Sequence, residues 1–513
     1  MCTSFRAAIF PSVAISACLL ASLWGCSKSG PSVSGTIAIS AAPQTVRTNN
    51  GLGTSYWQWA PTYGNLVAGT EDQVHKLVPF VMRVGGSNND LNAPDKFDDK
   101  QMDAAMTYVR AIGAEMILQV PILAARRANP DAGSDAGADS DAGSDFDAGS
   151  DADADTDAGS DTDAGSGPDA DAGSDAGYDS GPGVIAGAPN GPAIAAAMVS
   201  YANVQNTYGV KYFSIGNEPD LYSTATGYSG VPGYTPQDYC ADVTNYVAAM
   251  KAVDPTIKIV GPDLSWKYQS GSNDWLTPIL QTCGSLFDIV SIHRYPIDPS
   301  ATTVAAAAAD ASNLRSVIAH IQSILKATGN AGKPLAITEC NITWNGDPSN
   351  KVLPASPGTV PAGLWAADAF GVGLESGLWS TVFWSTREGW TLGLFASAMG
   401  TPKPQPAYWA LDLYAEHFGL TLLSVTSTPA NVNAYASRNQ SNDGTQVIAV
   451  NWNDMPAILT FKIDGLASAV TPPTFTLPAL SVAAIAIPDT GAASALVYGE
   501  TQHKADLPPQ PLQ

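Results

Sequence analysis

Residues 212–219 read YFSIGNEP, an apolar run that ends in Asn217, Glu218 and Pro219. A short run that is apolar on both faces is typical of a buried strand in a parallel sheet. Glu218 then follows directly at the carboxyl end of that strand. Parallel α/β folds carry their active sites at this edge of the sheet. The segment therefore predicts a buried parallel strand that presents a carboxylate at a functional edge.

Similar apolar runs recur along the chain, and helical stretches separate them. The expected strands cover 53–57, 80–84, 115–121, 212–217, 258–261, 287–293, 335–339 and 379–384. The expected helices cover 100–112, 192–209, 236–253, 274–283, 304–328 and 362–376. Eight strands that alternate with helices predict an α/β fold of the (β/α)8 TIM-barrel type.

The composition changes near residue 420, where short strand-like segments and polar turns replace the helices. The expected strands there are 432–437, 445–452, 457–463 and 481–487, and 36–40 is expected to complete the same unit. They predict a small C-terminal β-sandwich. The expected boundaries are 1–25 for a lipoprotein signal peptide, 26–35 for a tether, 36–419 for the barrel, 420–488 for the sandwich and 489–513 for a loose tail.

The charge is concentrated in one segment. The chain of 513 residues has a net charge of −23, and residues 129–183 supply 16 aspartates without a lysine or arginine, so the remainder carries −23 + 16 = −7. This Asp/Ala/Gly/Ser-rich segment has almost nothing apolar to bury, which predicts a disordered insert within the barrel. A mildly acidic body argues against a nucleic-acid partner, which would need a basic face.

The N-terminus has the pattern of an export signal. Arg6 is followed by an apolar stretch, residues 7–24, and then by Gly25 and Cys26. The run LWGC at 23–26 resembles a bacterial lipoprotein box, which implies cleavage before Cys26 and lipid attachment to its thiol. An ordinary signal peptide or an uncleaved anchor is the alternative. The protein is expected to be exported and held on a membrane, at the cell surface or in the periplasm.

Three of the six cysteines remain in the body of the protein. Cys240 is expected near the start of one helix and Cys283 near the end of the next. Neighbouring parallel helices place such positions at opposite ends, so no bridge is expected between them. Cys340 is expected to be a buried packing thiol.

A second strand also ends in a glutamate. Residues 334–339 read PLAITE, so Glu339 closes the seventh expected strand as Glu218 closes the fourth. The fourth and seventh strands of an eight-stranded barrel face each other across its mouth. The two carboxylates can therefore converge on one bound atom although they are 121 residues apart in the chain.

With these motifs the chain resembles the retaining glycoside hydrolases of clan A, the 4/7 superfamily. The resemblance covers about residues 51–419 without the insert. It rests on Asn217-Glu218-Pro219, Thr338-Glu339, His293-Arg294-Tyr295, Trp384 and residues 82–87, which read MRVGGS. The runs around Arg83 and Glu218 look most like families 79, 44 and 39.

The resemblance implies a mechanism with two carboxylic acids. Glu218 would be the general acid and then the general base, and Glu339 would be the nucleophile. Arg83 would hold Glu339 charged, and Asn217 would bind the 2-hydroxyl of the sugar. Tyr295 and His293 would line the same subsite, and Trp384 would form an apolar floor beneath the ring.

The sequence holds no motif that predicts a metal site or a cofactor. HExxH, CxxC and dinucleotide fingerprints are absent. The expected function is therefore retaining β-glycoside hydrolysis of a carbohydrate without a cofactor. The alternatives are a non-catalytic carbohydrate-binding lipoprotein on the same scaffold, or an adhesive lipoprotein whose working part is the insert.

Overall fold

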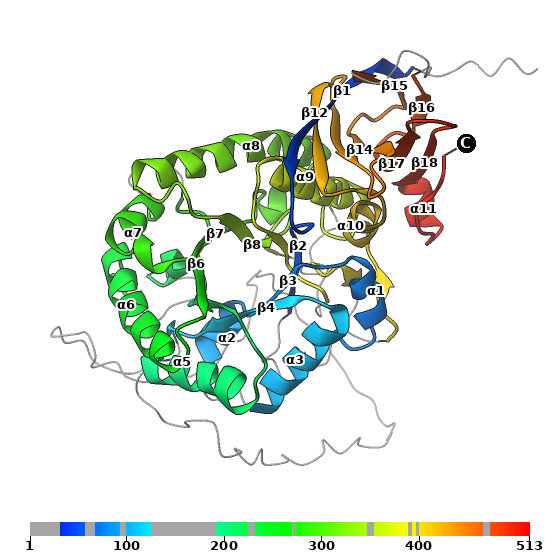
Figure 1. Cartoon of the computed structure of the whole chain (residues 1–513). Coiled ribbons are helices and arrows are strands. Elements are labelled where there is room, and N and C mark those ends of the chain that lie inside the picture. The colour runs from blue at the N-terminus through cyan, green and yellow to red at the C-terminus, as the bar shows by residue number, and fades with distance from the viewer. Residues whose placement is uncertain are drawn as a thin grey trace, which may run out of the picture.

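The computed structural model contains a barrel with a β domain packed against one side of it (Figure 1). It describes residues 31–56, 67–92, 99–123, 125, 191–223, 231–268, 271, 273–345, 353–387, 392–396, 400–464 and 472–512. The expected signal peptide, Cys26 and the insert at 129–183 lie outside these residues. Within the described ranges, no helix combines the length and the apolarity that crossing a membrane requires.

Eight parallel strands close the barrel in chain order, as the sequence predicts. They are β2 (Leu52–Tyr56), β3 (Val81–Val84), β4 (Glu115–Val120), β5 (Tyr212–Ile215), β6 (Lys258–Leu264), β7 (Ile289–Arg294), β8 (Leu335–Cys340) and β9 (Thr381–Phe383). The expected (β/α)8 fold is confirmed. Glu218 follows the fourth of these strands, and Glu339 lies on the seventh.

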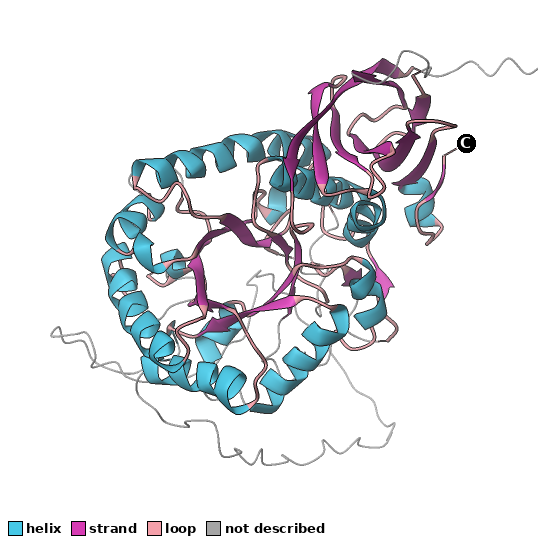
Figure 2. Cartoon of the chain, viewed as in Figure 1, coloured by secondary structure: helices cyan, strands magenta, loops and turns pink. Residues whose placement is uncertain are grey.

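Helices form a ring around the strands (Figure 2). They are α1 (Glu71–Lys76), α2 (Ser87–Asn92), α3 (Asp99–Ile112), α5 (Gly191–Val199), α6 (Pro236–Val253), α7 (Leu276–Thr282), α8 (Val304–Ala327), α9 (Val360–Glu375) and α10 (Pro406–His417). The expected helix 192–209 is shorter than predicted, because α5 passes into a π-helical turn, η2 (Ser200–Gln205). Helix α10 was not predicted.

The barrel interior is apolar at its N-terminal end and polar towards its mouth. A buried cluster takes one residue from each of seven strands: Val81, Ile117, Tyr212, Val260, Ile289, Ala336 and Val382. The eighth strand contributes Gly53 at this level, where a Cβ would lie 2.6 Å from Cγ2 of Val382. Because inward-facing positions alternate along a strand, residues two further along lie in the next layer. This layer includes Arg83, Gln119, Ser214, Ser291 and Thr338, and all of them are buried.

The β domain is one hydrogen-bonded sheet of nine strands, in the order β16-β15-β1-β12-β13-β14-β17-β18-β19. Their bounds are β1 (Val33–Val46), β12 (Thr421–Ser427), β13 (Val432–Arg438), β14 (Gly444–Asn451), β15 (Ala457–Asp464), β16 (Thr474–Leu477), β17 (Ser481–Pro488), β18 (Ser494–Gly499) and β19 (Gln510–Pro511). One face surrounds a single apolar cluster that draws on β1 and on β12 to β18. The N-terminal strand β1 belongs to this sheet, as expected, so the barrel proper starts at β2.

Two expected boundaries of this domain are wrong. Residues 489–513 are not a loose tail, because β18 pairs along its length with β17 and buries Val497 and Tyr498. The signal in the sequence was the short apolar run at 495–498, which reads ALVY. The tether expected at 26–35 also ends earlier, because Val33 already pairs with Ala457 at the start of β1.

The expectation that Cys240 and Cys283 remain apart is also wrong, because they form a disulfide with their Cα atoms 5.5 Å apart. The two cysteines would lie at opposite ends of the helices only if α6 and α7 had similar lengths. Helix α7 has only seven residues, which is about 10 Å, and Cys240 is the fifth residue of α6, about 6 Å from its start. The C-terminal end of α7 is therefore level with the second turn of α6. Cys340 is free and buried, as expected.

A buried aspartate joins the β domain to the barrel. Asp368 on α9 is fully buried, and its carboxylate accepts hydrogen bonds from Trp452 Nε1 at 2.6 Å, Asn433 Nδ2 at 2.7 Å and Tyr435 Oη at 2.8 Å. All three donors belong to the β domain. Burial raises the pKa of Asp368 to about 6, although the three donors oppose the shift.

This pKa predicts a pH-dependent stability. Because the pKa of Asp368 is higher in the folded protein than in the unfolded chain, its contribution to stability is complete below pH 3.8 and is lost as the pH rises through about 6. From pH 5 to pH 7 the free energy of unfolding of wild type should fall by roughly 1.4 kcal/mol relative to that of Asp368→Asn, because the asparagine does not titrate. Chemical denaturation at both pH values checks this. Asp454→Asn, at an exposed position, is the control, and an unchanged difference between wild type and Asp368→Asn would contradict the account.

Candidate active site

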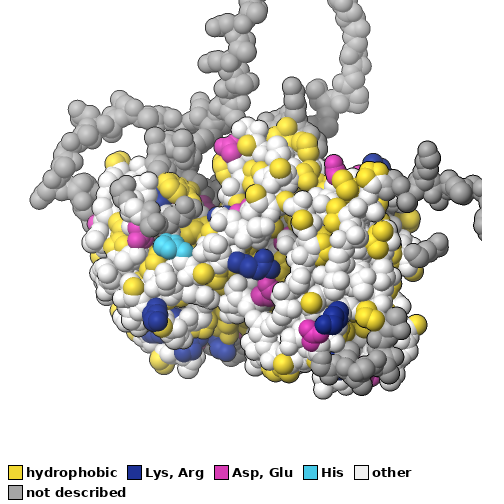
Figure 3. Space-filling model, turned by 90° about the horizontal axis from the view of Figure 1, so that it is seen from above, with side chains coloured by type: hydrophobic (Ala, Val, Ile, Leu, Met, Phe, Trp, Pro, Cys, Tyr) yellow, Lys and Arg dark blue, Asp and Glu magenta, His cyan; other side chains and the backbone are white. Residues whose placement is uncertain are grey.

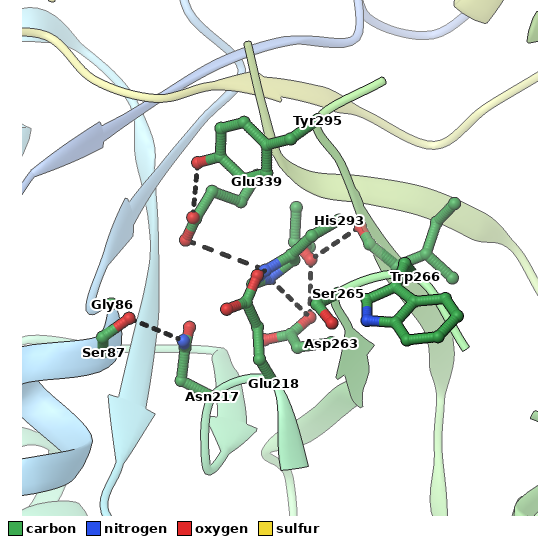
Figure 4. A network of polar contacts seen from close by, with 12 residues as sticks. Gly86, Ser87, Asn217, Glu218, Asp263, Ser265, Trp266, His293, Tyr295 and Glu339 are labelled. Atoms are coloured by element: carbon green, nitrogen blue, oxygen red, sulfur yellow. Dashed lines mark hydrogen bonds and ion pairs between the residues drawn. The ribbon is translucent and has the colours of Figure 1, made fainter. Parts of the chain in front are cut away.

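The residues that the sequence singled out lie at the C-terminal mouth of the barrel, and Figure 4 shows five of them, Asn217, Glu218, His293, Tyr295 and Glu339. Each comes from a different part of the strand ring: Arg83 from β3, Asn217 and Glu218 from the turn after β5, His293 and Tyr295 from the end of β7, Glu339 from β8 and Trp384 from the end of β9. Of the site residues named from the sequence, only Cys26 lies outside the described part of the chain.

Arg83 holds three of the strands together at this mouth. It is fully buried, and its Nη1 donates to Glu339 Oε2 at 2.7 Å. Its Nη2 donates to Asn217 Oδ1 at 2.7 Å and to Asp263 Oδ2 at 3.2 Å. A guanidinium can make these contacts at once because its donors form a rigid planar fork. Arg83 therefore fixes the end of β5, the end of β6 and the glutamate of β8 relative to one another.

Glu339 lies at a break in the strand pairing. His293 pairs with Glu339 although Ile292 pairs with Ile337, so Thr338 is the extra residue of a bulge. Such a bulge changes the direction of the side chains that follow it. Both Thr338 and Glu339 consequently reach the inside of the barrel. The Tyr295 hydroxyl donates to the second carboxylate oxygen of Glu339 at 2.5 Å, so both oxygens accept a hydrogen bond.

Glu218 lies in a left-handed turn, with φ 49° and ψ 54°. Its backbone N–H donates to the carbonyl of Asp263 at 3.1 Å, which stabilises this conformation. The preceding Gly216 also has a positive φ, and a Cβ there would lie 2.6 Å from the Tyr222 hydroxyl. Left-handed backbone at a residue other than glycine costs about 1–2 kcal/mol and clusters at functional sites.

His293 connects the two glutamates. Its Nδ1 lies 2.9 Å from Glu218 Oε1 and 3.9 Å from Glu339 Oε2. One ligand atom from each of the three residues lies within 4.8 Å of the other two. A divalent cation could in principle use such a set. The two oxygens of Glu339 already accept from Arg83 and Tyr295, however, and the positive charge of Arg83 would repel a second cation.

Asp263 completes the cluster, and the sequence analysis did not identify it. Its Oδ1 accepts hydrogen bonds from the hydroxyls of Ser291 and, at 2.5 Å, of Thr338. The same oxygen lies 4.0 Å from His293 Nε2. The signal was available, because the fifth expected strand runs into a Gly-Pro-Asp-Leu sequence that places a charge between buried residues. The expected strand ended at Gly261 and so excluded it.

A second buried aspartate positions the turn that carries Asn217 and Glu218. Asp90 on α2 accepts from the backbone N–H groups of Ile122 at 2.7 Å, Leu123 at 3.0 Å and Asn217 at 3.2 Å, and from the Tyr222 hydroxyl. Burial raises the pKa of Asp90 to about 6. The Asn217 side chain is therefore fixed from its backbone as well as from Arg83.

Burial and neighbouring charges shift the pKa values of the clustered residues in opposite directions. Burial raises the pKa of Glu339, as does the charge of Glu218, and together they outweigh the opposing effects of His293 and Arg83. This direction differs from the expectation that Arg83 holds Glu339 charged, because burial of the carboxylate outweighs the effect of Arg83 on its pKa. Burial lowers the pKa of His293. Burial alone would also raise the pKa of Asp263, but Arg83, His293 and the two hydroxyl donors hold it below its ordinary value.

Trp384 closes one side of the mouth and is almost fully buried. Its ring lies against Gly86, where a Cβ would lie 2.6 Å from Cη2 of the indole. Gly86 has φ 125° and its N–H donates to the Gln119 side chain at 2.5 Å. The peptide bond between Trp384 and Ser385 is cis.

Two further tryptophans lie just beyond strand ends and are exposed, Trp266 by 46% and Trp344 by 53%. Trp57, Trp59 and Trp390, which the sequence also placed near strand ends, lie outside the described residues.

Charged side chains are sparse on the face drawn in Figure 3, where lysines and arginines stand apart and acidic side chains lie among them.

Comparisons with known proteins agree with this geometry. Residues 194–353, which contain Glu218, His293 and Glu339, match the family described as glycosyl hydrolase catalytic core. The match covers 160 of the 513 residues and indicates the catalytic core of a glycoside hydrolase. No curated protein matches it at a significant level.

Solved structures of glycoside hydrolases share the fold of this chain. CelM2, a bifunctional glucanase-xylanase from a metagenome library, has 18% identity and a TM-score of 0.57 over 90% of this chain and 100% of its own. A Paenibacillus polymyxa xyloglucanase of family 44 has 12% identity and a TM-score of 0.59 over 89% of this chain and 100% of its own. AbfB, a family 51 α-L-arabinofuranosidase from Bifidobacterium longum, has 16% identity and a TM-score of 0.58 over 88% and 99%.

The close approach at Gly86 predicts a sharp effect of one methyl group. Gly86→Ala should displace the Trp384 ring and lower kcat/KM on glycosides by about 10²-fold, which is the scale of a 1 Å misplacement in an active site. Gly271→Ala is the matched control, because Gly271 has a similar φ of 121° but no atom within 4 Å of the added Cβ. Steady-state kinetics and the thermal midpoints of both variants check this. Equal losses of activity in the two would contradict the role given to the contact.

Proposed function

We propose that the protein is a retaining β-glycoside hydrolase that cleaves a polysaccharide or oligosaccharide by double displacement. The observation that carries the proposal is the separation of the two glutamates, whose nearest oxygens lie within 4.8 Å of each other at the barrel mouth. Retaining enzymes hold their carboxyl groups about 5–5.5 Å apart, whereas inverting enzymes leave about 6.5–9.5 Å for a water molecule.

The chemistry follows in two steps. Glu339 attacks the anomeric carbon while Glu218 gives its proton to the leaving glycosidic oxygen, so one C–O bond forms as the other breaks. Glu218, now ionised, then removes a proton from water, and the resulting hydroxide displaces Glu339 from the sugar. The sugar leaves with its original configuration and both glutamates return to their starting protonation states.

The neighbouring residues have roles that match their contacts. Arg83 and Tyr295 donate to the two oxygens of Glu339 and so orient it for attack. Asn217 is held by Arg83 through its oxygen and donates one amide hydrogen to Ser87 Oγ at 3.4 Å, which leaves its second amide hydrogen for the 2-hydroxyl of the sugar. His293 contacts Glu218, and Trp384 offers an apolar face beneath the ring.

A polymeric substrate is supported by the rim of the barrel. Trp266 follows β6 and its loop is anchored by Asp220, which accepts from Ser265 N at 3.0 Å and Lys267 N at 3.2 Å. An exposed indole on an anchored loop provides a rigid surface for a further sugar ring. The similar structures are named as a glucanase-xylanase, a xyloglucanase and arabinofuranosidases, so glucans, xylans, xyloglucan and arabinans form the first substrate panel.

Replacement of each glutamate should separate the two roles. With an aryl glycoside, Glu218→Ala and Glu339→Ala should each lose roughly 10³-fold or more in kcat/KM. Added azide should restore the activity of Glu218→Ala and give a glycosyl azide of retained configuration, because azide attacks the glycosyl–enzyme intermediate. Added azide should also restore the activity of Glu339→Ala, and here the glycosyl azide should have inverted configuration, because azide takes the place of the nucleophile. NMR of the azide products checks both results.

The control is Glu115→Ala, an exposed glutamate on β4 at the opposite end of the barrel, which should keep wild-type kinetics. Azide products of the reverse configurations would contradict the assigned roles. If wild type hydrolyses no substrate of the panel, as expected of Glu339→Ala, but binds the polymers, the carbohydrate-binding alternative is favoured.

We also propose export and lipid attachment at Cys26. The pattern of residues 7–26 and the disulfide between Cys240 and Cys283 support this, because disulfides persist in oxidising compartments outside the cytosol. In a bacterial host, wild type should incorporate labelled palmitate and partition into the detergent phase, and Cys26→Ala should do neither. Cys18→Ala, within the apolar run, is the control and should behave as wild type. An unlabelled wild type in the aqueous phase would contradict the anchor.

A further inference from the structure

Asp263 contacts Arg83 and the backbone of Glu218, and its carboxylate lies on the Nε2 side of His293, whereas the Glu218 carboxylate lies on the Nδ1 side. It is 1% exposed and lies at a bulge of β6, where the pairing with β7 shifts between Pro262 and Leu264. Its backbone carbonyl accepts from Glu218 N, one carboxylate oxygen accepts from Arg83, and the other lies beside His293 Nε2 (Figure 4). The residue therefore contacts the acid, the histidine and the arginine that binds the nucleophile.

The contact between His293 and Glu218 needs a proton. A nitrogen and an oxygen at 2.9 Å form a hydrogen bond only if one of them carries hydrogen, so a proton lies on either His293 Nδ1 or Glu218 Oε1. His293 Nε2 has no hydrogen-bond partner among the described residues, but it faces Asp263 Oδ1 at 4.0 Å. An anion at that distance favours a proton on Nε2.

A count of charges shows why Asp263 matters. The cluster contains three buried carboxylates, Glu218, Asp263 and Glu339, and one guanidinium, Arg83. With all three carboxylates ionised, the buried site would carry a net charge of −2, which burial strongly disfavours. Asp263 accepts from Arg83 and from two hydroxyls, so it stays ionised. Without the negative charge of Asp263, the positive charge of Arg83 would favour ionisation of both glutamates.

We infer that Asp263 is a positioning residue whose fixed negative charge, placed between Arg83 and His293, keeps on the pair formed by His293 and Glu218 one proton more than a neutral imidazole and a carboxylate would carry. This rests on the proposed function, because that proton is the one that Glu218 gives to the leaving oxygen. Glu339 is a poor place for it, since both of its oxygens already accept from Arg83 and Tyr295. Asp263 thus separates the protonation of two glutamates that share one pocket.

Five charged or titratable groups face this pair, and they come from several strands of the barrel. They are Arg83 on β3, Asp220 after Glu218, Asp263 on β6, Tyr295 after β7 and Glu339 on β8. Of these, Asp263 is the carboxylate that contacts Arg83 and His293 together and lies away from the space between the glutamates. Its replacement therefore changes the charge of the cluster and leaves the groups that contact the sugar in place.

The test is the pH dependence of kcat/KM for Asp263→Asn. Asparagine has the same shape, and the hydroxyls of Ser291 and Thr338 can turn to match its amide. Loss of the negative charge weakens the hold on the proton, so the alkaline limb of the profile should move to lower pH by about one unit. At a pH above the limb, activity should therefore fall about tenfold more than at a pH below it.

Asp310→Asn is the matched control, because Asp310 is also buried and paired with an arginine, Arg294, but lies on α8 outside the barrel mouth. Its alkaline limb should stay at the wild-type position. An alkaline limb that does not move in Asp263→Asn, whatever its loss of activity, would overturn the inference.

A second measurement uses wild type and does not depend on the folding of a variant. The chain has five histidines, so ¹⁵N-histidine NMR is tractable, and His293→Gln assigns the signal. His293 should show a protonated Nε2 at neutral pH, and an unprotonated Nε2 would overturn the inference. If wild type proves to have no hydrolase activity, the proposed function fails, and this NMR result still decides the role of Asp263.

Discussion

The guanidinium of Arg83 is the contact on which the geometry of the mouth depends. It is buried in a layer that also holds neutral polar side chains such as Gln119 and Ser214, and this layer lies above an apolar cluster. A buried cation without partners would cost several kcal/mol. Its three acceptors, Asn217, Asp263 and Glu339, come from three separate strands, so the barrel must close in one register to satisfy it. The arrangement that stabilises the charge also brings the glutamates together.

The barrel supplies the rest of the arrangement by simple geometry. Alternate side chains of each parallel strand face the interior, and the strands all end at the same mouth. A bulge in β8 adds Glu339 to the inward set, and another in β6 does so for Asp263. The left-handed turn at Glu218 brings a third carboxylate to the same space. Local departures from regular strand geometry therefore occur where the chemistry requires charge, as expected for functional sites.

Apolar periodicity was enough to predict the eight barrel strands, most of the outer helices and both glutamates. It failed where the outcome depended on lengths or on three-dimensional neighbours. The disulfide was missed because α7 is shorter than its neighbour, and β18 was missed because six residues near the chain end carry a weak pattern. Asp263 was missed because β6 continues through a bulge beyond the expected strand end. No pattern within one segment could show that Arg83 would be shared between two carboxylates.

The proposed double displacement depends on the short separation of Glu218 and Glu339, whose nearest oxygens lie within 4.8 Å of each other, whereas inverting enzymes hold their carboxyl groups about 6.5–9.5 Å apart. The most direct test follows the first product of hydrolysis by ¹H NMR, before mutarotation, with a β-linked oligosaccharide that wild type cleaves. The account predicts that the β-anomer appears first and the α-anomer only later. Initial formation of the α-anomer would mean inversion by a bound water molecule and would contradict the mechanism built on Glu218 and Glu339.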